Sequence, residues 1–429
     1  MQHSISRRTF LKTSLLTTGG FWVATSTGFA RKFSANEKLN LGVIGTINRA
    51  SANLNGVRDQ NNVAICDIED KLLAAAQARF PQAKTYTDFR KMLDRRDLDA
   101  VVVSTPDHTH AVATMAALKS GRHVYCEKPL AHEVFEVRAV TEAARKHKLA
   151  TQMGTQIHAT ANYRRVVELI EKEAIGPVSE VHVWCARAWS VGGRPAETPP
   201  IPAGLHWDLW LGPAPGRPYA PGYHPVDWRR WWDFGGGTLG DMGCHYLDLP
   251  FWALKLRAPT RIEAEGPPVH AETTPAWLIV HYQFPARGPL PALQLTWYNS
   301  GKVPELIKEG KVPAWGSGVL FIGAKGMLLA DYGRRLLLPE KDYEGFQPPA
   351  PYLPDSIGHH KEWIAACKGG APALCHFSYA GPLAETVLLG NAAFRSGRKL
   401  EWNSAACKVT NTRDADPFIR RRYRKGWKL

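Results

Sequence analysis

Asp241 and His245 could act together as an acid–base pair. They are four positions apart in Gly240-Asp241-Met242-Gly243-Cys244-His245, a helix-like stretch, so their side chains share one face. A carboxylate beside an imidazole orients the ring and raises its basicity, which suits His245 to accept a proton near neutral pH. The same spacing also occurs in helix pairs that only stabilise structure. Asp248 extends the face, but no further ligands at metal-binding spacing accompany it, so we expect no metal site.

Lys128 is a further candidate, because it closely follows an apolar run that predicts a buried strand. That run is His123-Val124-Tyr125-Cys126, and Glu127-Lys128-Pro129 comes next. A second stretch, Ser104-Thr105-Pro106-Asp107-His108-Thr109-His110, begins where another apolar run ends. Ligands of open parallel sheets bind at the carboxyl ends of strands, so we expect both stretches at one site. There the ammonium of Lys128 could hydrogen-bond a substrate hydroxyl and lower its pKa, unless it is an ordinary surface lysine.

The first apolar run of the chain predicts a dinucleotide-binding turn. The run ends at Gly45, and Asp67 closes a second run about 20 positions later, the separation expected in a dinucleotide fold. An acid at that position binds ribose hydroxyls and repels a 2′-phosphate, which favours NAD over NADP. Gly45-Thr46-Ile47-Asn48-Arg49-Ala50 keeps the first glycine of the fingerprint and accepts Ala at the third. Ile47 stands at the second, where a side chain crowds the pyrophosphate.

Alternating strand and helix patterns predict an α/β protein with two domains, in keeping with a length of 429 residues. Between residues 38 and 155 the two patterns alternate at the pace of a parallel sheet with right-handed crossovers, which indicates a Rossmann dinucleotide-binding domain. From about Gly176 the strand-like runs are separated by turn residues. Residues 156–405 are therefore expected to form a C-terminal α+β substrate domain with a mostly antiparallel open sheet.

An aromatic-rich segment precedes the Asp241/His245 pair. Its rings and basic side chains are Trp207, Trp210, Tyr219, Tyr223, Trp228, Trp231 and Trp232, with His224, Arg229 and Arg230. Aromatic faces stack on the C–H faces of sugar rings, so the segment favours a carbohydrate substrate. Most of these rings are expected to fill the domain interface. His224 and Arg229, together with Tyr163, are the predicted substrate contacts.

The two ends of the chain are both basic, within a formal net charge of +15. Residues 1–35 look like a twin-arginine signal and linker, with Arg7-Arg8 before an apolar stretch that is too short and too polar for a good membrane span. This predicts the Tat export machinery as a partner and a periplasmic or otherwise exported location, with a cleaved or an anchored leader. Residues 406–429 form a basic tail, which we expect to be solvated or interface-forming. The other basic residues are spread widely, so no nucleic-acid partner is expected.

These motifs closely resemble those of the Gfo/Idh/MocA oxidoreductases, named for glucose–fructose oxidoreductase and inositol dehydrogenase. Glu127-Lys128-Pro129 is the mark of that family, and the likeness continues through Gly154-Thr155-Gln156 and the Asp241/His245 stretch. The resemblance implies catalytic and substrate-binding roles for Lys128, Asp241 and His245, and homo-oligomers formed through the C-terminal sheet. The predicted cofactor contacts are Gly45, Thr46, Ile47, Asn48, Asp67, Ser104, Thr105, Pro106, His108, His110, Glu127, Lys128 and Gln156.

The predicted site suits hydride transfer and leaves three functions open. Hydride transfer from a carbinol needs a base for the hydroxyl proton, a donor near the forming carbonyl oxygen and a C–H bond aimed at the nicotinamide. The chain could be an oxidoreductase acting on a sugar, polyol or glycoside, or an NAD-assisted glycosidase or lyase that passes through a transient keto-sugar. Given Ile47, a non-catalytic sugar-binding relative is the third. Free NAD is scarce outside the cytoplasm, so an exported enzyme is expected to hold its cofactor through turnover.

Overall fold

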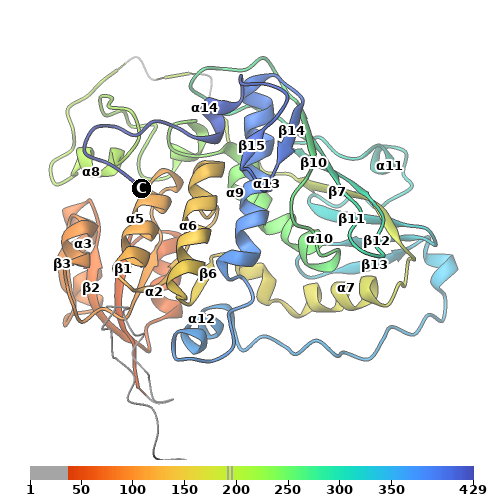
Figure 1. The fold of residues 1–429 in the computed structure, drawn as a ribbon, viewed down its shortest axis with the longest axis horizontal. Helices are drawn as coiled ribbons and strands as arrows, with labels where there is room; N and C mark the ends of the chain where they lie inside the picture. Colours follow the sequence, from red (N-terminus) through yellow and green to blue (C-terminus); the bar gives the residue numbers. More distant parts are fainter. Residues whose placement is uncertain (1–36, 191–192, 195–196) are drawn as a thin grey trace, which may run out of the picture. The chain divides into compact units, whose positions relative to one another are not determined.

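The computed structural model describes residues 37–190, 193–194 and 197–429. The predicted export signal at residues 1–35 lies outside these residues. The described chain contains two β-sheets and the helices that cover them (Figure 1). Within this part of the chain, no helix is long and apolar enough to cross a membrane.

The first sheet is parallel and has six strands in the order β3-β2-β1-β4-β5-β6. Its central strands are apolar runs because helices cover both faces; all four residues of β4 are buried. The strands are β1 (Asn40–Ile44), β2 (Asn61–Cys66), β3 (Lys84–Tyr86), β4 (Ala100–Val103), β5 (His123–Cys126) and β6 (Thr151–Met153). The helices are α2 (Arg49–Gly56), α3 (Asp70–Arg79), α4 (Phe89–Leu93), α5 (Asp107–Lys119) and α6 (Val134–His147). The strand order reverses between β1 and β4, and ligands bind beyond the carboxyl ends of strands at such a point.

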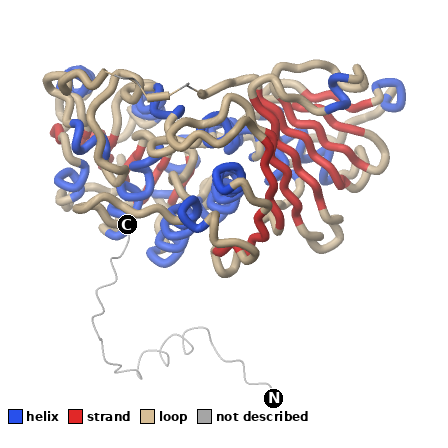
Figure 2. The backbone as a smooth tube through the Cα atoms, turned by 90° about the horizontal axis from the view of Figure 1, so that it is seen from above, coloured by secondary structure: helices blue, strands red, loops and turns tan. Residues whose placement is uncertain are grey.

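The second sheet has nine strands in the order β13-β12-β11-β7-β10-β9-β8-β14-β15. Among its described ladders, only β7 and β10 pair in parallel. The strands are β7 (Val178–Cys185), β8 (Arg261–Glu265), β9 (Ile279–Phe284), β10 (Leu293–Asn299), β11 (Gly318–Gly323), β12 (Met327–Ala330), β13 (Arg335–Leu338), β14 (Leu400–Asn403) and β15 (Lys408–Val409). Helices α7 (Ala161–Glu171), α9 (Gly237–Tyr246), α10 (Asp248–Ala253) and α13 (Phe377–Ser396) share its apolar core on one side (Figure 2). The two sheets confirm the predicted fold class.

One helix from the second half of the chain returns to the first sheet, which its sequence pattern did not predict. This helix, α12 (His359–Cys367), places Trp363 in one apolar cluster with Leu41 and Tyr125 of the parallel sheet. The His360 ring stacks on Tyr125, with 5.1 Å between ring centroids. One apolar cluster of the parallel sheet therefore includes residues that lie more than two hundred positions after its strands in the sequence.

The basic tail also returns to the first sheet, and the expectation that it is solvated or forms an interface is wrong for its central residues (Figure 1). The Arg421 side chain is 11% exposed, with Nε 2.8 Å from Glu136 Oε1 on α6. Arg421 also donates to the carbonyl oxygen of His108 at 2.6 Å. A buried guanidinium is tolerated only where a carboxylate and hydrogen-bond acceptors meet it, and Glu136 supplies that carboxylate.

Candidate active site

A cavity of about 670 Å³ lies at the carboxyl ends of the parallel strands. The loops after β1 to β5, helix α9 and the aromatic-rich segment all contribute to its wall. It brings together most of the predicted cofactor contacts: Gly45, Thr46, Ile47, Asn48, Asp67, Ser104, Thr105, Pro106, His110, Glu127, Lys128 and Gln156. The predicted substrate residues His224, Arg229, Asp241 and His245 line the same space. One cavity of this size, rather than two separate sites, fits a cofactor beside a small substrate.

The loop after β1 has the form that a dinucleotide needs. Gly45 has φ 92°, and a Cβ there would lie 2.7 Å from the Ser104 carbonyl oxygen, so only glycine fits. The next residue with positive φ is Asn48, at 53°, and not Ile47. Asparagine adopts positive φ more readily than other non-glycine residues. The backbone at Ile47 therefore needs no glycine, and the predicted crowding by its side chain, which lines the cavity, stays a prediction.

Asp67 lies at the end of β2, where an acid would meet the adenosine ribose. Its Oδ2 accepts a hydrogen bond from Thr46 Oγ1 at 2.6 Å, and its Oδ1 accepts one from the Glu69 amide at 3.2 Å. Burial raises the pKa of Asp67 despite these hydrogen bonds. His224, a predicted substrate contact, lies at the same end of the cavity, with Nε2 3.1 Å from Glu69 Oε2. The structure thus places His224 beside Glu69, two residues after Asp67.

Glu127, which lines the cavity, connects helix α2 to the residue Gln156 that follows β6. Its Oε1 accepts hydrogen bonds from Asn53 Nδ2 at 2.9 Å and from Gln156 Nε2 at 2.7 Å. The same Asn53 amide donates to Ser104 Oγ at 2.9 Å, and the side-chain oxygen of Asn53 lies 3.0 Å from His360 Nε2. These hydrogen bonds fix the position of α2 relative to the carboxyl ends of β4 and β5. Nothing in the sequence pattern singled out Asn53 or His360, whose partners are all distant in the chain.

Lys128 and Asp241 form a buried ion pair in the wall of the cavity. Lys128 Nζ lies 2.6 Å from Asp241 Oδ1 and 2.7 Å from the Asp241 carbonyl oxygen, and both side chains are 9% exposed. Arg229 Nε also donates to Oδ1 at 3.1 Å, while Trp189 Nε1 donates to Oδ2 at 2.7 Å. Burial opposes ionisation, but the positive charges of Lys128 and Arg229 hold the pKa of Asp241 well below its ordinary value. The carboxylate stays ionised and fixes the ammonium in place.

His245 lies on the same face of α9 as Asp241, but the predicted hydrogen-bonded pair is not formed. Among the described residues, the Asp241 carboxylate is bonded to Lys128, Arg229 and Trp189 and not to His245. His245 Nδ1 is buried and has no hydrogen-bond partner in this part of the chain. Burial, and next the positive charge of Lys128, lower the pKa of His245 to about 3. The imidazole is therefore neutral near pH 7 and free to accept a hydrogen bond or a proton, but its lowered pKa makes it a weaker base than a free imidazole, and Asp241 does not orient it.

Two predicted site residues are not brought to the cavity. His108, predicted to contact the cofactor, is fully buried, with Nε2 2.7 Å from the Trp210 carbonyl oxygen and its ring 5.1 Å from that of Phe234. Tyr163, predicted to contact substrate, is also fully buried, and its hydroxyl donates to the His245 carbonyl oxygen at 3.1 Å. Both predictions are corrected, because helical periodicity turns these side chains into the core.

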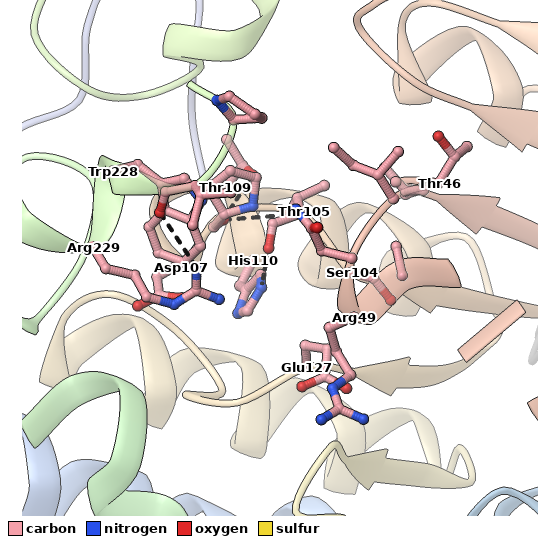
Figure 3. Close-up of a pocket in the computed structure, with 18 of the residues that line it drawn as sticks. Thr46, Arg49, Ser104, Thr105, Asp107, Thr109, His110, Glu127, Trp228 and Arg229 are labelled. Carbon is pink, nitrogen blue, oxygen red and sulfur yellow. Dashed lines mark hydrogen bonds between the residues drawn. The ribbon is translucent and has the colours of Figure 1, made fainter. Parts of the chain in front are cut away.

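Asp107 is a cavity residue that sequence reasoning missed. It begins α5, and Figure 3 places it on the same side of the cavity as Arg229, away from Thr46. It is 3% exposed, and burial raises its pKa to about 7. The available signal was its place inside the Ser104–His110 stretch, but an acid in the first turn of a helix is also what the helix dipole favours. The burial of Asp107 is the observation that separates a site residue from an ordinary acid at a helix N-terminus.

The raised pKa of Asp107 predicts a pH-dependent stability change in Asp107→Asn. Because the folded pKa exceeds the unfolded one, the folded protein holds the extra proton between about pH 4 and pH 7, and stability falls as pH rises through that window. Removing the charge should stabilise the protein at pH 8 by on the order of 2 kcal/mol, and by little at pH 4. Thermal or urea unfolding at both pH values checks this, and an equal effect at each would contradict it.

Two family models match the chain. The NAD-binding Rossmann fold of the Gfo/Idh/MocA oxidoreductase family matches residues 39–155, and the family's C-terminal alpha/beta domain matches residues 177–288. Together they span more than half of the chain. Both Asp67 and the Lys128 loop fall in the first match, and Asp241 and His245 fall in the second.

Curated relatives are similar over part of the chain. A levoglucosan dehydrogenase of Pseudarthrobacter phenanthrenivorans is 26% identical over 186 residues, which is 43% of this chain and 40% of the relative. An inositol 2-dehydrogenase of Salmonella typhimurium is 30% identical over 34% of this chain and 43% of the relative. A glycosyl hydrolase family 109 protein of Solibacter usitatus is 34% identical over 33% and 37%. The matches thus span less than half the length of each relative.

Solved structures share the fold over most of the chain. The WlbA dehydrogenase of Bordetella pertussis, in complex with NADH and UDP-GlcNAcA, has a TM-score of 0.62 at 18% identity, covering 86% of this chain and 98% of its own. GenD2 from gentamicin A biosynthesis, in complex with NAD, has a TM-score of 0.60 at 21% identity, covering 87% and 99%. With both family models and this shared architecture, the chain belongs to the Gfo/Idh/MocA family of NAD-binding oxidoreductases.

Proposed function

We propose that this protein oxidises a CH–OH group of a sugar, polyol or glycoside, using a tightly held NAD. One observation carries the proposal: the Lys128–Asp241 ion pair and the neutral His245 share a single cavity with the Gly45 loop and Asp67. The Gly45 loop and the N-terminus of α2 would hold the pyrophosphate, and Asp67 would bind the adenosine ribose, which favours NAD over NADP. The names of the dehydrogenase relatives support a carbohydrate or polyol substrate.

The residues at the Lys128 end divide the work of oxidation. When bound, the nicotinamide ring supplies the acceptor for the hydride. Lys128, held in place by Asp241, donates a hydrogen bond to the substrate oxygen and stabilises the negative charge that develops there. His245 is neutral and accepts the hydroxyl proton. Arg229 donates to the same Asp241 oxygen as Lys128, and Trp189 donates to the other oxygen, so the carboxylate that positions the ammonium is itself held in place.

A second candidate is redox-neutral cleavage of a glycoside, favoured by the similarity to the glycosyl hydrolase family 109 protein. Oxidation at C3 of the sugar makes the C2 proton acidic; its removal expels the aglycone from C1, and addition of water and return of the hydride restore the sugar. This route needs no pair of catalytic carboxylates. It does need a proton for the leaving group, and the buried Asp107 carboxyl, with its pKa raised by burial to about 7, could supply it.

Two measurements test these functions. The purified protein is denatured and any released nucleotide identified by mass spectrometry, and the native protein is then incubated with free sugars and with aryl glycosides without added NAD. A keto-sugar formed with one equivalent of NADH supports simple oxidation. Repeated release of aglycone supports the redox-neutral route. The absence of both bound nucleotide and NAD(H) affinity would sink both and favour a non-catalytic sugar-binding relative.

We further propose that the protein is exported through the twin-arginine pathway and assembles through the nine-stranded sheet. The Arg7-Arg8 stretch supports export of a folded, cofactor-loaded protein. The seven cysteines are all free, and six of them are buried, as suits folding in a reducing compartment. Cell fractionation of an Arg7→Lys, Arg8→Lys variant tests export: retention of the variant in the cytoplasm is expected, and unchanged export refutes the signal. Light scattering of the purified protein tests assembly.

A further inference from the structure

Trp427, near the end of the basic tail, lines the cavity that is formed otherwise by residues of the two sheets and their loops. Its ring centroid lies 6.0 Å from that of Phe89, the first residue of α4, and the Arg90 guanidinium carbon lies 4.6 Å above the ring. The side chain is only partly buried. An aromatic residue that the fold of the two sheets does not require is therefore held at the rim of the site.

Trp427 lies at the adenosine end of this cavity. Its neighbours Phe89 and Arg90 come shortly after β3, and β3 pairs with β2, which Asp67 follows. In a dinucleotide fold the acid after the second strand binds the adenosine ribose, so the adenine lies beyond it on the β3 side. Lys128 and His245 mark the opposite, nicotinamide end, beyond β5.

Residues 420–429 are attached at three places, one of which is the hydrogen bond that Lys119 Nζ on α5 donates to the Leu429 carbonyl oxygen at 3.1 Å. Arg421 Nε and the Tyr423 hydroxyl both donate to Glu136 Oε1 on α6, at 2.8 and 2.6 Å. Arg424 donates to the carbonyl oxygens of Asp208 and Gly212, at 2.8 and 3.0 Å, and pairs with the Asp208 carboxylate. Gly212 follows α8 (Trp207–Leu211), in the aromatic-rich segment. The Trp427 amide then donates to the Arg424 carbonyl oxygen at 3.1 Å, so the position of the ring follows that of Arg424.

We propose that residues 420–429 form a clasp that holds Trp427 over the adenosine end of the cavity and slows the release of bound dinucleotide. The inference rests on the proposed NAD binding and adds to it the element that retains the cofactor. An indole ring supplies a flat apolar face on which a purine can stack. Such stacking occurs with any base and needs no hydrogen bond. None of these attachments involves a residue that lines the cavity, and opening of the clasp would break the Arg421–Glu136 and Arg424–Asp208 ion pairs.

Release of NADH from the full-length protein tests the clasp. The protein is loaded with NADH and chased with excess NAD⁺, and the loss of bound-NADH fluorescence gives the dissociation rate. Trp427→Ala should release NADH about tenfold faster or more, as expected for loss of one ring–base stack, with a smaller change in the association rate. Trp427→Phe should be intermediate. Arg424→Ala, whose side chain lies outside the cavity, should also release NADH faster because it detaches the clasp.

Lys425→Ala is the matched control, because Lys425 belongs to the same segment, is exposed and does not line the cavity. It should release NADH at the wild-type rate. Trp427 is only partly buried, so its variants should keep the wild-type unfolding temperature without nucleotide, and the graded effect of Phe and Ala separates a lost ring from a lost fold. Wild-type release rates in both Trp427→Ala and Arg424→Ala would overturn the clasp while leaving NAD binding intact. A wild-type protein without NADH affinity would instead refute the proposed function.

Discussion

Lys128→Ala should lower kcat/KM by about 10²–10³-fold while the protein still binds NAD. In the proposed mechanism the ammonium donates to the substrate oxygen on which charge develops, and two contacts with Asp241 fix it in place. Steady-state kinetics on whichever substrate the panel identifies measures the loss in turnover, and NADH fluorescence measures the retained binding.

Lys128→Ala should lower the free energy of unfolding by less than the loss of one partner of a buried ion pair usually does. Leaving a buried charge without a partner costs about 3–5 kcal/mol, but Asp241 keeps its hydrogen bonds from Arg229 and Trp189. Lys128→Arg serves as the control: it keeps the charge, yet a planar guanidinium cannot take the place of a compact ammonium between two oxygens of Asp241, so activity should stay low. Wild-type turnover in Lys128→Ala would show that Lys128 takes no part in catalysis.

His245→Ala should lower kcat by about 10²–10⁴-fold, the usual contribution of a positioned base. Added imidazole should restore part of the activity, because the deletion leaves a space beside the cavity that the free base fits. Tyr163→Phe is the control, at a residue outside the cavity: it removes the hydroxyl that donates to the His245 carbonyl oxygen, and turnover should change little. Equal losses in both variants would mean that His245 acts through structure and not as a base.

The low pKa of His245 also sets the sign of its pH dependence. Its pKa is about 3 in the folded protein and near 6.5 when unfolded, so the unfolded chain binds the proton more tightly between these values. The contribution of His245 to stability is therefore complete above about pH 6.5 and is lost progressively as pH falls. The His245→Ala variant should lose less stability than the wild type between pH 7 and pH 5, measured by urea unfolding.

Local patterns in the sequence predicted the fold and most residues of the candidate site. Apolar runs that alternate with helical stretches predict a parallel sheet from local sequence alone. The carboxyl ends of its strands then lie at one edge of the sheet. Gly45, Asp67 and Lys128 each follow a strand, so their meeting in one cavity could be predicted without a structure. The helical spacing of Asp241 and His245 likewise predicted a shared face correctly, since a shared face depends only on the geometry of one helix.

Tertiary structure decided which partner each of these side chains takes. Lys128 and Asp241 are 113 positions apart, and no periodic pattern in the sequence could predict their contact. In the structure the ammonium binds the carboxylate that the sequence pattern had paired with His245. Burial, which depends on every surrounding element, placed His108 and Tyr163 in the core and raised the pKa of Asp107. The sequence by itself thus determined the NAD-binding fold and the residue types at its strand ends. The tertiary structure alone decided their pairing and protonation and the return of the basic tail to the cavity, because these follow from long-range contacts.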